Sequence, residues 1–147
     1  FGSWSFNNNV QGTTATLAYA FGTGIDLSNE SAFRFGTVNN AETGWDFSLE
    51  ATVEDLLGGS ASTILSFDVD DEGSALTASF ADFAGVDFTQ VSNLTLALSG
   101  TGTGAAPDAS ISGSIAAVPV PATLPLSLAA LGILGLYARR QRGTARA

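Results

Sequence analysis

Hydrophobic and polar residues alternate along several stretches of the first 117 residues. The longest alternation covers residues 45–53, where the apolar positions are Trp45, Phe47, Leu49, Ala51 and Val53. A second covers residues 64–70, where we expect Leu65, Phe67 and Val69 to point inward. Successive side chains of a β-strand point to opposite faces, so this period predicts strands with one buried face and one polar face.

Weaker alternation predicts further short strands, at residues 4–6, 14–21, 33–35, 75–80, 91–99 and 109–116. Segments rich in Gly, Asn and Asp lie between them and are typical of turns, Asn39-Asn40 among them. About eight strands of this kind predict an all-β fold, an antiparallel β-sandwich of jelly-roll type, with a barrel as the alternative. Val53–Leu57 is the one helix-like patch in this part of the sequence, and it suffices for a single turn.

The pattern changes after residue 117. Residues 118–123 read VPVPAT, and residues 124–137 form an apolar run of 14 residues without a charge. As a helix this run measures roughly 21 Å, which is short of the roughly 30 Å hydrocarbon core. Ala122, Ala138 and long arginine side chains extend the span on its two sides. We therefore predict a single C-terminal hydrophobic α-helix that crosses a membrane. A helix buried in the domain fits poorly, since the run is apolar on all sides.

This reading divides the chain into four parts. Residues 1–117 are expected to form an extracellular β-sandwich domain, and residues 118–123 a proline-containing motif and linker. The transmembrane helix is predicted over residues 124–138, and a basic cytoplasmic tail over residues 139–147.

Acidic and basic residues are distributed unevenly between the first 117 residues and the segment that follows. All 14 acidic residues lie between Asp26 and Asp108, whereas four of the five basic residues follow residue 138. Residues 1–117 therefore carry a net charge of −13 and residues 118–147 a net charge of +4. A domain this acidic repels nucleic acid, so we expect no nucleic-acid partner. The positive-inside rule places Arg139, Arg140 and Arg142 in the cytoplasm and the acidic domain outside.

The amino-acid composition excludes several kinds of catalytic and metal-binding chemistry. The chain has no cysteine and no histidine, which excludes disulfides, thiolate metal sites and the commonest general base. Glu50 with Asp68 or Asp70 is a candidate catalytic carboxylate pair, but every antiparallel sheet of so acidic a chain has a polar face. We predict that the protein is not an enzyme and has no cofactor. The chain also has no methionine, so we expect Phe1 to begin a processed form or a fragment.

The densest acidic segment is residues 68–73, DVDDEG. Asp68, Asp70 and Glu72 are spaced two residues apart before a glycine, and carboxylates in such an arrangement can converge on Ca²⁺. The segment is not an EF-hand, because the twelfth position is Ser79. The alternative is a strand that continues into a solvated acidic turn, and we favour this reading.

Aromatic residues give a second candidate site. Trp4, Tyr19 and Trp45 are of the type that stacks on sugars, yet each lies in register with apolar neighbours, which predicts core packing instead. Residues 80–96, FADFAGVDFTQVSNLTL, resemble the closing part of jelly-roll domains related to carbohydrate-binding modules. This resemblance implies the fold, and it makes extracellular polysaccharide a candidate partner.

The C-terminal segment carries a more specific resemblance. Val118, Pro119, Val120, Pro121 and Ala122, followed by the apolar run and the cluster Arg139-Arg140-Gln141-Arg142, resemble the PEP-CTERM class of bacterial sorting signals. The variant closest to it is the VPLPA type, from which the chain departs at Val120. The resemblance implies recognition in the inner membrane by an exosortase, a membrane protease thought to cut near the proline motif. It also implies a host that is a Gram-negative bacterium making exopolysaccharide.

Two prolines disfavour helix and keep this motif extended, so a protease can reach the backbone. We therefore expect a non-enzymatic, exported protein that is transiently anchored in the inner membrane and then reaches the cell surface or extracellular matrix. The alternatives are simple anchoring by an uncut tail, and a carbohydrate-binding module acting on exopolysaccharide with or without Ca²⁺.

Overall fold

The computed structural model describes residues 4–7, 14–102, 108–112 and 115–119. Within these ranges the elements follow the order β1 (Trp4–Asn7), β2 (Thr14–Ile25), β3 (Glu30–Ala41), β4 (Trp45–Asp55), β5 (Ser60–Phe67), η1 (Val69–Asp71), β6 (Ala75–Ser79), η2 (Phe80–Asp82), β7 (Val91–Gly102), β8 (Asp108–Ser112) and β9 (Ala116–Pro119). The two η elements are single 3-10 turns. The prediction of an all-β chain is confirmed for the described residues.

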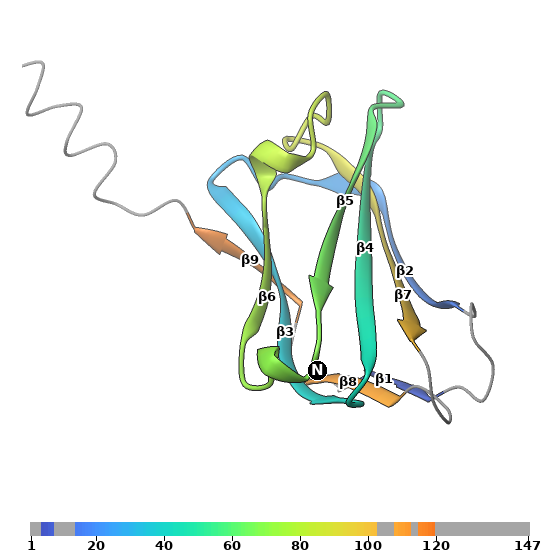
Figure 1. Ribbon diagram of the computed structural model, residues 1–147. Helices are drawn as coiled ribbons and strands as arrows, with labels where there is room; N and C mark the ends of the chain where they lie inside the picture. Colours follow the sequence, from blue (N-terminus) through green and yellow to red (C-terminus); the bar gives the residue numbers. More distant parts are fainter. Residues whose placement is uncertain (1–3, 8–13, 103–107, 113–114, 120–147) are drawn as a thin grey trace, which may run out of the picture.

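The strands form two antiparallel sheets (Figure 1). One has the order β1-β8-β3-β6, with β9 added on β3, and the other has the order β2-β7-β4-β5. β1 pairs with β8, β2 with β7, β3 with β6 and β4 with β5. These four pairs are those of a long hairpin wound into two sheets, which is the strand order of a jelly roll.

The core lies between the two sheets. Strand β4 alternates buried and more exposed side chains along its whole length, as its sequence predicts. Its inner residues meet those of β7, for example at the pairs Leu49 with Leu98 and Ala51 with Leu96. All four of these side chains are fully buried. The alternation in the sequence thus produces an apolar layer, because β4 and β7 both turn their apolar faces toward the core.

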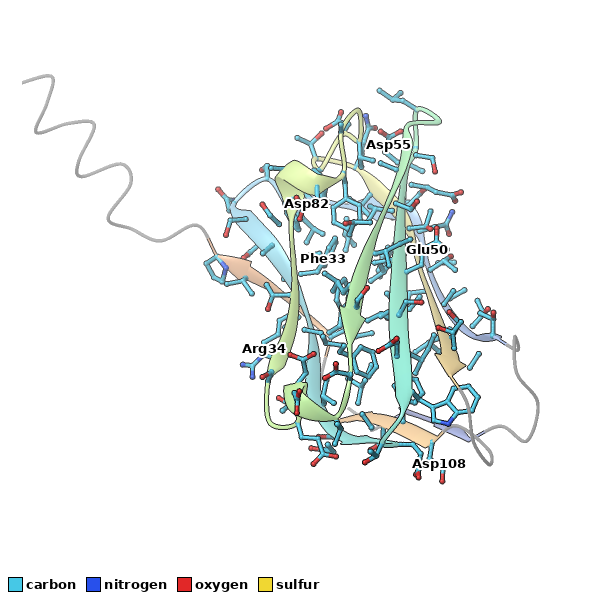
Figure 2. All side chains as sticks on the ribbon, viewed as in Figure 1. Phe33, Arg34, Glu50, Asp55, Asp82 and Asp108 are labelled. Atoms are coloured by element: carbon cyan, nitrogen blue, oxygen red, sulfur yellow. The ribbon has the colours of Figure 1, made fainter. Side chains whose placement is uncertain are left out.

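An aromatic cluster fills the core next to β3 and the β6–β7 connection. The ring of Phe33 lies 4.8 Å from that of Phe80, 6.0 Å from that of Phe83 and 6.4 Å from that of Phe88, measured between centroids. Figure 2 shows Phe33 pointing into the sandwich while its neighbour Arg34 points away from it. Such tilted and edge-on ring pairs add to the stability gained from burying apolar area.

Four local expectations are wrong. Residues 53–57 are not helical, because β4 continues to Asp55 and a turn follows. Asn39-Asn40 is not a turn but part of β3, which pairs with β8 there through a register shift. Val69 is 37% exposed in η1 and not inside, and Tyr19 on β2 is 39% exposed and not core.

The C-terminal helix predicted over residues 124–138 lies outside the described residues. Among the residues that the structure describes, no helix is long and apolar enough to cross a membrane.

Candidate functional site

The last described strand contains the first residues of the proline motif. β9 ends with Val118-Pro119, and it pairs with the first half of β3: Ala116 lies opposite Arg34, Ala117 opposite Phe33, Val118 opposite Ala32 and Pro119 opposite Glu30. β9 therefore runs two residues past the domain boundary expected at residue 117. Figure 1 shows β9 alongside β3, at the side of its sheet.

Strand β3 can accept β9 because one of its two edges is divided between two partner strands. One edge pairs with β6 over residues 32–37. The other edge pairs with β8 over residues 37–41 and with β9 over residues 30–34. Without β9, residues 30–34 of β3 would present unpaired backbone groups on that edge, which is a general liability of sheets.

A side chain adds to this pairing. The register shifts between Glu30 and Ala32, so Ser31 is the extra residue of a bulge opposite the motif. The Ser31 hydroxyl donates to the carbonyl oxygen of Val118 at 3.2 Å, and the carbonyl oxygen of Pro119 lies 3.5 Å from it. Pro119 has no backbone N–H, so its carbonyl is the group that it offers to a neighbouring strand.

Val120, Pro121 and Ala122 lie outside the described residues, as do Arg139, Arg140 and Arg142. Of the sequence-predicted sorting residues, the structure thus locates Val118 and Pro119, and it places both on the folded domain.

Two of the three candidate Ca²⁺ ligands, Asp68 and Glu72, have structural tasks in the fold, whereas Asp70 is exposed. The Asp68 carboxylate caps η1 and accepts from the backbone N–H of Asp70 at 2.8 Å. The Glu72 carboxylate accepts from the N–H of Ala41 on β3 at 3.2 Å. Among the described residues, no group of three or more His, Cys, Asp or Glu side chains is arranged to hold a metal ion. The segment is an acidic turn that ties β5 and β6 to the end of β3.

The carboxylate pair considered for catalysis is far apart in the sheet. Glu50 on β4 lies opposite Ile64 on β5, and Asp68 follows four residues later. At about 3.3 Å per residue the separation along the strand is roughly 13 Å. This exceeds the roughly 5 to 9.5 Å between the two carboxyl groups of glycosidases.

Sequence reasoning missed a network of loops at one end of the sandwich. Asp55 ends β4 and is the buried charged residue among those described, with 6% of its surface exposed. Its carboxylate accepts from the backbone N–H of Leu57 and of Gly59, each at 2.8 Å, and from that of Asp87 at 2.7 Å. One side chain thus joins the β4–β5 turn to the β6–β7 connection. The available signal is the segment Asp55–Gly59, DLLGG, because Asp followed by glycines is typical of turns.

The same network holds a second aspartate. Asp87 accepts from the hydroxyl and the backbone N–H of Thr89, at 2.7 and 2.9 Å, and from the side-chain amide of Gln90 at 2.8 Å. The hydrogen bonds from Thr89 hold the pKa of Asp87 below its ordinary value. The backbone N–H groups of Asp87 and Gly59 likewise lower the pKa of Asp55, although burial acts in the opposite direction. At neutral pH both groups are therefore anions that hold loops together.

The lowered pKa of Asp55 predicts how the stability of the fold changes at low pH. A carboxyl group with a lowered folded-state pKa contributes stability above its unfolded pKa, near 4, and loses that contribution as pH falls through the folded value. An Asp55→Ala variant should melt well below the parent protein at pH 7, and the gap between the two melting temperatures should narrow below about pH 4. Thermal melting followed by circular dichroism from pH 7 to pH 3 measures both quantities. Glu50→Gln, at an exposed residue of the same strand, is the control and should melt like the parent. A gap that stays constant with pH would contradict this role of Asp55.

Comparison with known protein families bears on the C-terminal segment. Residues 117–142 match the family of the PEP-CTERM protein-sorting motif. A separate comparison with curated proteins finds no match for the chain. The matched range begins in β9 and contains both prolines, the apolar run and the cluster of arginines. Residues 117–142 are therefore a PEP-CTERM protein-sorting motif, the signal of an exported protein that an exosortase in the membrane recognises.

Proposed function

We propose that this chain is a non-enzymatic cell-surface or extracellular-matrix protein. Its β-sandwich is the exported domain, and its C-terminal segment is a temporary membrane anchor. The match of residues 117–142 to the sorting motif carries the proposal. A signal of this class implies transient anchoring at the membrane before release to the surface.

The charge distribution supports the same orientation. Residues 1–117 carry a net charge of −13 and the segment after them a net charge of +4. Arginines next to an apolar run favour the cytoplasmic side, whereas the acidic domain is repelled by anionic headgroups. The chain is therefore suited to holding its domain on the outer side of the membrane that its tail crosses.

The folded domain supports a structural rather than a catalytic role. The carboxylates that the fold buries or hydrogen-bonds most tightly, Asp55 and Asp87, have lowered pKa values. A general acid needs the opposite, a pKa raised toward neutrality. The Asp55 carboxylate joins two loops through their backbone amides, and the Asp87 carboxylate holds its own loop through Thr89 and Gln90.

Release from the membrane tests the proposal. The chain, preceded by an export signal, would be produced in a bacterium that has an exosortase and in the same strain without it. We expect the protein outside the membrane fraction in the first strain and in the membrane fraction in the second. A chain ending at residue 119 is the control and should leave the membrane fraction in both strains. Equal membrane retention of the full chain in both strains would contradict the proposal.

A further inference from the structure

The sorting motif and the folded domain share residues. The family match begins at Ala117, and β9 ends at Pro119, so Ala117, Val118 and Pro119 belong to both. A processing enzyme must therefore handle a motif whose first residues are already strand-paired with β3.

Proteases act on backbone that is accessible and extended, and residues paired in a sheet are cut only from an opened state. Opening β9 has specific costs here. It would break the pairing over residues 30–34 of β3 and the hydrogen bond from the Ser31 hydroxyl to Val118. It would also uncover the edge of β3 at Phe33, a residue that is 4% exposed and lies at the centre of the aromatic cluster.

From this geometry we propose that the domain itself sets the upstream limit of processing. β9 shields Ala116–Pro119 from a protease, so no cut falls before the bond that follows Pro119. The released protein then keeps β9 as the strand that covers the edge of β3. The biological meaning rests on the proposed function, whereas the shielding is a property of the fold alone.

Only a short stretch of chain then remains in which the enzyme can cut. Four residues, Val120–Thr123, separate β9 from the apolar run that begins at Leu124. Even fully extended, the five steps from Pro119 to Leu124 span at most roughly 18 Å. The folded domain therefore lies close to the membrane surface before release, and an enzyme that cuts in this stretch must have its active site near that surface.

Two alanines of β9 offer a matched pair of variants. Ala117 is half-buried opposite Phe33, whereas Ala116 is exposed opposite the exposed Arg34. Ala117→Asp places a charge against the aromatic core and should release β9, because a buried unpaired carboxylate is strongly unfavourable. Ala116→Asp makes the same chemical change on the outer side, beside a positive charge, and should leave β9 in place.

Limited proteolysis of the full chain in detergent tests the shielding without any exosortase. A protease of broad specificity is applied, and the intact mass of the resistant core gives its C-terminal residue. We expect the parent and Ala116→Asp to be trimmed to Pro119 or to a residue soon after it, and Ala117→Asp to be trimmed to a residue before Ala116. Trimming of the parent itself to a residue before Ala116 would overturn the proposal, and so would equal trimming of the two variants.

The host experiment separates this inference from the proposed function. In cells with an exosortase, a mature C-terminus within residues 119–123 would support both. A mature C-terminus before Pro119 but after Ile115 would keep the proposed function and overturn the inference. Protein that keeps residues 124–147 would overturn the proposed function, and the proteolysis result would then decide the inference by itself.

Discussion

Replacing Phe33 with alanine is expected to destabilise the domain by about 3 to 5 kcal/mol, the usual cost of removing a buried phenylalanine ring. The ring is 4% exposed and contacts the rings of Phe35, Phe80, Phe83 and Phe88. The loss combines the transfer of a large apolar group, the cavity left among four aromatic rings and the lost ring–ring interactions. A domain of this size is stable by only about 5 to 15 kcal/mol, so the variant should lie near the limit of folding.

Chemical denaturation followed by tryptophan fluorescence measures this effect, since Trp45 is 3% exposed in the same core. Tyr19→Ala is the control. Its side chain is 39% exposed on β2, so its removal should cost about 1 kcal/mol or less. Equal losses for the two variants would show that the aromatic cluster is not the centre of the core.

Leu131→Asp is expected to abolish membrane retention of the full chain in a strain without an exosortase. Leu131 lies in the middle of the apolar run, where an aspartate is disfavoured by about 3.5 kcal/mol and a leucine is favoured by about 0.5 kcal/mol. The difference, about 4 kcal/mol, corresponds to nearly a thousandfold change in the insertion equilibrium. Membrane fractionation measures it. Leu131→Ile keeps the hydrophobicity and should be retained like the parent. Full retention of Leu131→Asp would contradict the role of this run as a membrane segment.

The strands with strong alternation could be predicted from the sequence, and the bulged ones could not. β4 has a period of two along its whole length, and its burial follows that period. β3 instead continues through Asn39-Asn40 because β8 pairs with it across a register shift. β2 likewise absorbs Gly22 and Gly24, both with positive φ, at a shift in its pairing with β7. Local turn propensity indicates flexibility in the chain, but the partner strand decides whether a turn or a bulge forms.

Part of the candidate site could be predicted from the sequence, and part could not. The sorting motif could be recognised from sequence because its parts are contiguous. The pairing of β9 could not, because residues 109–116 read as one strand, whereas β8 ends at Ser112 and β9 begins at Ala116. Its partner Ser31 is 87 residues away in sequence from Val118. Asp55 was missed for a similar reason, since the Asp87 amide that it binds is 32 residues distant. Contacts of this kind depend on the winding of the jelly roll and leave no local period.

If the C-terminal segment is a transient anchor, it is absent from the mature protein. The intact mass of the protein recovered from the surface or medium of an exosortase-containing host measures this. We expect a chain that has lost residues 124–147 and still contains β9 through Pro119. A recovered protein that ends at Ala147 would contradict this expectation.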